Sequence, residues 1–133
     1  MIGVFMVVIV LLGGILYLFL SPKVPSISPD DLKKVMENNQ NILIIDVREK
    51  REYESGHIPG AVHVPLRQLE RLKKEADQQE NGGGVYIYCR SGSRSAIAVR
   101  ELRKLGCRNV YLLRGGLINW NGPVQKAEEK TDE

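Results

Sequence analysis

The chain carries the sequence VYIYCRSGSRS at residues 85–95, and this stretch decides how the residues around it fold. Its first four residues are β-branched or aromatic, which is typical of a buried strand. A helical pattern follows the loop at residues 95–105. The sequence therefore predicts a strand whose carboxyl end leads through a short loop into the amino end of a helix. Such a turn directs backbone N–H groups and the positive end of the helix dipole toward an anion.

Cys89 is the first group that this turn would stabilise, as a thiolate. A free thiol titrates near about 8.5, and a helix amino end with nearby cations lowers that value to about 3.5–7.5. The pattern predicts an anionic nucleophile acting on an anionic substrate, and a buried cysteine without a chemical role is the alternative. Six residues are candidates for substrate binding: Arg90, Ser91, Gly92, Ser93, Arg94 and Ser95.

Strands and helices alternate along the chain on both sides of this loop. Strands are predicted at residues 42–45, 62–64, 85–88 and 109–113, and helices at residues 28–38, 49–55, 66–79 and 95–105, with a short last helix after Gly115-Gly116. That order is typical of an α/β fold in which helices cover both faces of a parallel sheet. Ligands bind such sheets at the carboxyl ends of the strands. Asp46 and Cys89 both lie at such ends, so we expect them along one edge of the sheet.

Residues 2–20 contain no charged side chain. As a helix they would span about 28 Å, close to the roughly 30 Å of a bilayer's hydrocarbon core. Residues 1–21 are therefore expected to be a single-pass transmembrane anchor in contact with lipid. A cleaved signal peptide is the alternative, but no Lys or Arg precedes the run and no small-x-small cleavage pattern follows it. Lys23, Lys33 and Lys34 come after the span, so the positive-inside rule places the following domain in the cytoplasm.

We expect the rest of the chain to divide into a linker at residues 22–27, one domain at residues 28–125 and a charged, disordered tail at residues 126–133. The net charge of +3 comes from interspersed charges, which indicates a mixed solvated surface and no nucleic-acid partner. Two scattered cysteines and two histidines offer neither zinc-ligand spacing nor a disulfide framework, which fits a reducing compartment. Cys107 is expected to pack in the interior, with a role as resolving thiol for Cys89 as the alternative.

Four separated stretches resemble the motifs of single-domain rhodaneses, over about residues 27–122. They are IDVRE at residues 45–49 with Glu52-Tyr53, GHIPGA at residues 56–61, CRSGSRS at residues 89–95, and Gly115-Gly116 with Trp120. The resemblance implies a five-stranded parallel sheet flanked by helices, and an enzyme that needs no cofactor or metal. It also implies a two-step transfer. The Cys89 thiolate takes the outer sulfur of an anionic donor such as thiosulfate, releasing sulfite, and the persulfide then passes its sulfur to cyanide or a thiol acceptor.

The resemblance assigns further roles to the matched residues. Arg90 and Arg94 would orient the donor anion. Asp46 and Arg48 are expected to pair near the edge of the site, with direct substrate contact as the alternative. His57 is expected to brace its turn by a hydrogen bond, with acid–base catalysis as the alternative. Other expectations are an ion pair or surface position for Glu52, no special role for His63, and a core position for Trp120.

Two other functions compete with sulfur transfer. Phosphatases related to this fold carry a Cys-x5-Arg loop, whereas Cys89 and Arg94 enclose only four residues. The shorter loop favours sulfur over a tetrahedral phosphoryl group. The other alternative is a membrane-tethered sulfur-carrier or interaction module that serves a membrane or sulfur-relay protein partner.

Overall fold

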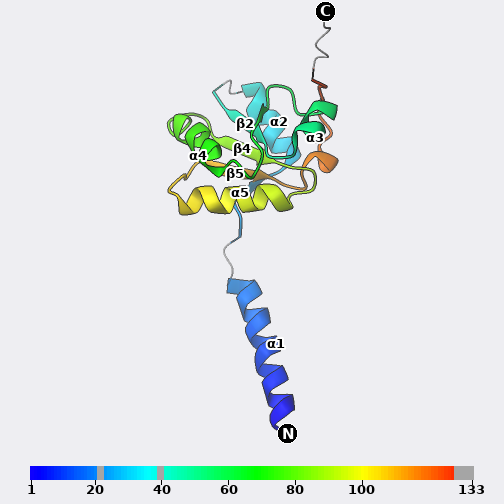
Figure 1. Ribbon diagram of the computed structural model, residues 1–133, viewed down its shortest axis with the longest axis vertical. Coiled ribbons are helices and arrows are strands. Elements are labelled where there is room, and N and C mark those ends of the chain that lie inside the picture. The colour runs from blue at the N-terminus through cyan, green and yellow to red at the C-terminus, as the bar shows by residue number, and fades with distance from the viewer. Residues whose placement is uncertain (21–22, 39–40, 128–133) are drawn as a thin grey trace, which may run out of the picture.

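The computed structural model describes residues 1–20, 23–38 and 41–127. An apolar helix, α1, stands at the N-terminus apart from a domain in which strands and helices alternate (Figure 1). The elements in chain order are α1 (Ile2–Leu20), β1 (Ser26–Ile27), α2 (Pro29–Asn38), β2 (Leu43–Asp46), α3 (Lys50–Ser55), β3 (Val62–His63), α4 (Leu69–Gln78), β4 (Val85–Tyr88), α5 (Ser93–Lys104), β5 (Val110–Leu113) and the 3₁₀ helix η1 (Leu117–Asn119).

The five strands form one parallel sheet in the order β1-β5-β4-β2-β3. Strand β4 lies in the middle, with Val85 paired to Leu43 of β2 and to Val110 of β5. The predicted α/β class and the five-stranded parallel sheet implied by the resemblance are confirmed. Because all strands run the same way, the residues that follow them meet at one edge of the sheet.

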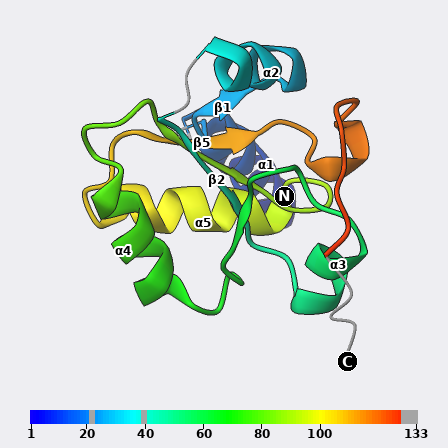
Figure 2. The same cartoon turned by 90° about the horizontal axis from the view of Figure 1, so that it is seen from above.

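Both faces of the sheet are covered, with α2 on one side and α4 and α5 on the other (Figure 2). Side chains of successive strand residues point to opposite faces. Ile87 and Cys89 accordingly belong to the apolar core beneath α4 and α5, whereas Tyr86 and Tyr88 belong to the core on the α2 side. The alternation places the Cys89 side chain on the face that α5 covers.

Some boundaries differ from those expected. Ser26 and Ile27, placed within the linker at residues 22–27, instead form edge strand β1 and pair with Leu112 and Leu113. Helix α5 begins at Ser93, two residues earlier than expected, and α4 covers a shorter range than residues 66–79. Residues 21–22 of the expected anchor and linker lie outside the described residues.

The end of the domain extends to the last described residue. The backbone of Gln125 exchanges two hydrogen bonds with that of His57, at 2.8 and 2.9 Å, and the N–H of Ala127 donates to the Glu54 carbonyl at 3.1 Å. The start of the expected tail at residues 126–133 therefore contacts α3, and its residues 128–133 lie outside the described residues.

Helix α1 is apolar along its whole length, and none of its residues is buried in the structure. Within the described ranges, it is the one helix with the length and composition to cross a membrane, properties that a signal sequence also has. The structure therefore leaves a large apolar surface that the domain does not cover.

Candidate active site

Cys89 directly follows β4 and is 1% exposed. The backbone N–H of Gly92 donates to its Sγ at 3.1 Å, and the Ser95 hydroxyl lies 3.3 Å from the same sulfur. The loop turns back on the sulfur because Gly92 adopts a φ of +118°, which a side chain would disfavour. The Ser95 hydroxyl also lies 3.1 Å from the Gly92 carbonyl. The Ser95 hydroxyl has one proton and cannot donate to both neighbours at once. It donates to the Gly92 carbonyl when Cys89 is a neutral thiol, and to the Cys89 sulfur when Cys89 is a thiolate.

These contacts set the acidity of Cys89. Burial is the largest single influence and opposes ionisation, but hydrogen bonds from the Ser95 hydroxyl and from the backbone of Ser95, Gly92 and Ser91 outweigh it, so the pKa of Cys89 is lowered. Backbone N–H groups at the start of α5 thus stabilise the sulfur anion, as the sequence predicted. Of the two arginines expected to be nearby cations, Arg94 interacts electrostatically with Cys89, although the hydrogen bonds are the larger favourable influences on the pKa of Cys89.

Removal of the Ser95 hydroxyl tests this arrangement. In Ser95→Ala the thiolate loses one donor, so the pKa of Cys89 should rise and alkylation by iodoacetamide should reach half its maximal rate at a higher pH. The Ser93→Ala variant is the matched control, because the Ser93 side chain is exposed and makes no contact with the sulfur. Equal pH profiles for the two variants would show that Ser95 does not stabilise the thiolate.

The glycine pair after β5 supports the cysteine loop from behind. The N–H of Leu117 donates to the Cys89 carbonyl at 2.9 Å, and that of Ile118 donates to the Arg90 carbonyl at 3.1 Å. Gly116 has a φ of +65°, and a Cβ there would lie 2.5 Å from the Arg90 carbonyl oxygen. The close approach therefore requires glycine at this position, and the loop carbonyls are held away from the sulfur.

Arg94 is engaged with a neighbour. Its guanidinium makes two hydrogen bonds to the Glu52 carboxylate, at 2.7 and 2.9 Å, between side chains that are each about one-third exposed. The Arg94 hydrogen bonds are the main reason that the pKa of Glu52 falls to about 2. The ion pair expected for Glu52 is confirmed, and it ties α3 to the first turn of α5. Orientation of a donor anion by Arg94 stays a prediction.

Arg90 presents the free cation of the loop. Its side chain is exposed and, among the residues that the structure describes, makes no ion pair or hydrogen bond. It borders a surface hollow of about 360 Å³ together with Arg48, Glu52, Ser55, Leu117 and Ile118. The hollow combines a free positive charge with the exposed Ile118 side chain, close to the loop that bears Cys89. Ser91 and Ser93 are exposed on the outer side of the loop.

Asp46 and Arg48 form a buried ion pair at the same edge of the sheet. The Arg48 Nη2 atom lies 2.8 Å from Asp46 Oδ2 and donates to the Gly56 carbonyl at 2.6 Å. The backbone N–H of Arg48 also donates a hydrogen bond to Asp46 Oδ1 at 2.9 Å. The expected pairing is therefore present, and through Gly56 it fixes the turn that follows α3. Direct substrate contact by either residue stays untested.

His57 and His63 lie on either side of one tyrosine ring. His57 Nδ1 is 2.9 Å from the Tyr53 carbonyl oxygen, and the His57 ring stacks on Tyr53 with centroids 3.9 Å apart. This contact is the bracing hydrogen bond that was expected. His63 stacks on Tyr53 at 4.8 Å, and its Nε2 lies 2.7 Å from the Arg48 carbonyl oxygen. The sequence analysis missed this position of His63, because no spacing in the chain indicates the stack.

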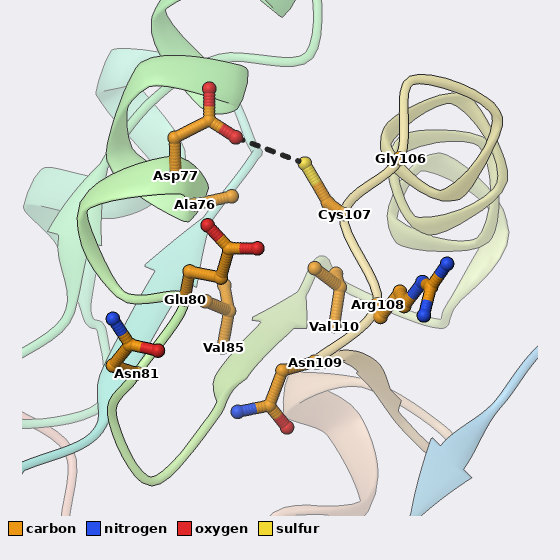
Figure 3. Close-up of a pocket in the computed structure, with 10 residues that line it drawn as sticks. All are labelled: Ala76, Asp77, Glu80, Asn81, Val85, Gly106, Cys107, Arg108, Asn109 and Val110. Atoms are coloured by element: carbon orange, nitrogen blue, oxygen red, sulfur yellow. Dashed lines mark hydrogen bonds between the residues drawn. The ribbon is translucent and has the colours of Figure 1, made fainter.

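Cys107 lies at the opposite edge of the sheet. It precedes β5 in a pocket of about 290 Å³, and its thiol points toward Asp77 at 3.6 Å (Figure 3). Burial, followed by the charge of Asp77, raises the pKa of the Cys107 thiol. The length of β4 alone separates the two edges by roughly 13 Å, too far for a Cys89–Cys107 disulfide. The geometry favours the packing role over the resolving thiol.

Together these features define a class: a parallel α/β domain with a thiol held in a loop of backbone donors at a strand's carboxyl end. The chain belongs to the rhodanese family, since the profile of the rhodanese-like domain matches residues 28–123. It is 36% identical over 102 residues to the Bacillus subtilis protein YrkF, which is named as a sulfur carrier, covering 77% of this chain. It is 33% identical over 97 residues to a sulfurtransferase of Allochromatium vinosum, covering 73% of this chain and 88% of that protein.

The solved structures agree with this assignment. The rhodanese-like domain of the Alr3790 protein from Anabaena superposes with a TM-score of 0.67 at 29% identity, covering 84% of this chain and 86% of that one. The chain spans only 54% of the length of YrkF. What the relatives share with it is therefore the domain that carries Cys89.

Proposed function

We propose that the protein is a sulfurtransferase in which Cys89 carries the transferred sulfur as a persulfide. The observation that carries this proposal is the contact of the Cys89 sulfur with the Gly92 N–H and the Ser95 hydroxyl, which favours the thiolate. The names of relatives as sulfurtransferases and as a sulfur carrier support the same reaction class. Neither step requires acid–base catalysis by a glutamate or histidine side chain, and neither step requires a metal ion.

The first step makes one bond and breaks one. The Cys89 thiolate attacks the outer sulfur of a thiosulfate-type donor, a new S–S bond forms, and sulfite leaves with the electron pair of the old one. The product is a persulfide anion on Cys89, which the same N–H groups can bind in place of the thiolate. Arg90 is suited to attract the donor because its guanidinium is exposed and unpaired in the described part of the chain.

The second step returns the enzyme to its starting state. A thiolate or cyanide attacks the terminal sulfur, takes it up, and Cys89 leaves as the thiolate. The hollow bordered by Arg90, next in the chain to Cys89, is the space in which we expect an acceptor to bind. Because the first step has already released sulfite, the acceptor does not compete with the donor for this space.

Loading the protein with thiosulfate tests the proposal. The intact mass of the full chain should rise by about 32 Da, and the added sulfur should map to Cys89 and be lost on treatment with cyanide. The Cys107→Ser variant is the matched control and should load equally. A lack of adduct under conditions that load a known sulfurtransferase would overturn the proposal, as would hydrolysis of aryl phosphates without sulfur transfer.

We also propose that α1 anchors the domain to a membrane with the domain in the cytoplasm. The support is the uniformly apolar, unburied surface of α1 and the lysines that follow it. Protease added outside sealed cells should leave the domain intact, and digestion from outside would reverse the orientation. Recovery of the protein in the soluble fraction, with residues 1–20 removed, would identify a signal sequence instead.

A further inference from the structure

A short connection joins α1 to the domain. Helix α1 ends at Leu20 and β1 begins at Ser26. Six peptide steps reach at most roughly 22 Å even when fully extended. If α1 crosses a bilayer, as proposed above, one face of the domain must therefore stay within a short distance of the lipid headgroups. At that distance the surface charge of the membrane acts on the domain.

The outer face of α5 has the composition of a surface that binds lipid headgroups. Ile97 and Leu105 are each 47% exposed, whereas the large apolar side chains of α2 and α4 are buried or half-buried. Arg100 and Lys104 follow Ile97 at helical spacing and are exposed beside it, and Arg108 is exposed just beyond the helix. The face is thus apolar with a basic border, the combination found in helices that lie on anionic membranes.

The charged side chains on this face of α5 are mostly basic. Lys104 lies 3.3 Å from Glu101 in an exposed pair, which removes part of its charge. Arg100 and Arg108 have no ion pair among the described residues. The face therefore keeps an excess of positive charge over Glu101, although Arg108 also borders the Cys107 pocket, which Asp77 and Glu80 line.

The opposite face of the domain is of a different kind. Helix α2 begins with Asp30 and Asp31, and its exposed side also carries Lys34 and Glu37. Its large apolar side chains point inward to the core. An anionic membrane would attract the α5 face and not the α2 face. Figure 1 draws α5 on the side of the domain from which α1 extends.

We propose that the outer face of α5, formed by Ile97, Arg100, Lys104, Leu105 and Arg108, rests on the anionic surface of the membrane that α1 crosses. The tether makes this contact intramolecular, so even a weak affinity for lipid headgroups is enough to hold the domain in one orientation. The Cys89 loop lies at the amino end of α5. It then opens sideways along the membrane surface, where water-soluble donors and acceptors can reach it.

The test uses the full chain in lipid nanodiscs, with a paramagnetic label on some lipid headgroups. In discs rich in phosphatidylglycerol, backbone amide signals of residues 97–108 should broaden at least twofold more than those of residues 30–37. In discs of phosphatidylcholine alone, this difference should shrink. Reversing the charges with Arg100→Glu, Lys104→Glu and Arg108→Glu should abolish it. The matched control, Lys33→Glu with Lys34→Glu on α2, should leave it unchanged.

Two other outcomes would contradict the proposed contact. Equal broadening of both helices, or stronger broadening of residues 30–37, in a chain that stays with the nanodisc would overturn the α5 contact while leaving the anchor in place. A chain that does not incorporate into nanodiscs would overturn the anchor and the contact together. Neither result bears on persulfide formation at Cys89, which the mass measurement tests separately.

Discussion

Cys89→Ser should reduce thiosulfate-to-cyanide sulfur transfer by about 10³-fold or more, the scale on which loss of a covalent nucleophile acts. A serine hydroxyl is not ionised near neutral pH, and the hydrogen bonds that stabilise a sulfur anion do not make it nucleophilic enough to attack a sulfane sulfur. The measurement is the rate of thiocyanate formation by purified full-length protein. Folding should be unaffected, because serine occupies less space than cysteine and retains a partner in Ser95.

The other cysteine provides the control for this result. Cys107 lies at the far edge of the sheet, beside Asp77, and has a raised pKa. Cys107→Ser should keep most of the wild-type rate. If Cys89→Ser retained more than about a tenth of the activity while Cys107→Ser lost it, the transferred sulfur would travel through Cys107, contrary to the mechanism proposed here.

Arg48→Ala should lower the free energy of unfolding by about 3–5 kcal/mol, because it leaves the Asp46 carboxylate charged and unpaired in the interior. Asp46 is fully buried, and Arg48 supplies it with side-chain hydrogen bonds as well as holding the Gly56 carbonyl. Urea unfolding followed by circular dichroism at pH 7 measures the loss.

An exposed pair serves as the comparison. Arg67 and Glu49 lie 2.6 Å apart, but their side chains are 62% and 60% exposed, so Arg67→Ala should cost less than about 1 kcal/mol. The double variant Asp46→Asn with Arg48→Met should recover part of the stability lost in Arg48→Ala, since it removes the buried charge. Equal losses in Arg48→Ala and Arg67→Ala would show that the buried pair contributes no more than a surface one.

The central strands could be predicted from the sequence because they are short apolar runs between clear turn signals. Residues 85–88 are buried on both faces of the sheet, and their composition reflects that burial directly. Strand β1 could not be predicted in the same way. It has two residues, beside Pro25, and it is a strand only because Leu112 and Leu113 of β5 lie opposite it. Nothing within residues 22–27 contains that information.

The cysteine loop was predictable for a similar reason, since its donors come from residues within six positions of Cys89. The supporting contacts were harder to anticipate. Arg94 and Glu52 are 42 positions apart, so the sequence indicates that Glu52 has a partner without identifying it. The ring stack of His57, Tyr53 and His63 depends on the folded arrangement of α3 and β3. Such contacts follow from topology and not from local pattern.

The backbone contacts behind the cysteine loop have a consequence for how this domain changes over evolutionary time. Leu117 and Ile118 hold the carbonyls of Cys89 and Arg90 through N–H groups, which any residue but proline provides. The side chain at position 90 can therefore be replaced without disturbing the donors around the sulfur. The donors to the sulfur are backbone N–H groups and the Ser95 hydroxyl, whereas Arg90 and Ile118 border the hollow beside the loop. Changes at the residues that border the hollow can therefore accumulate without altering the contacts that stabilise the Cys89 thiolate.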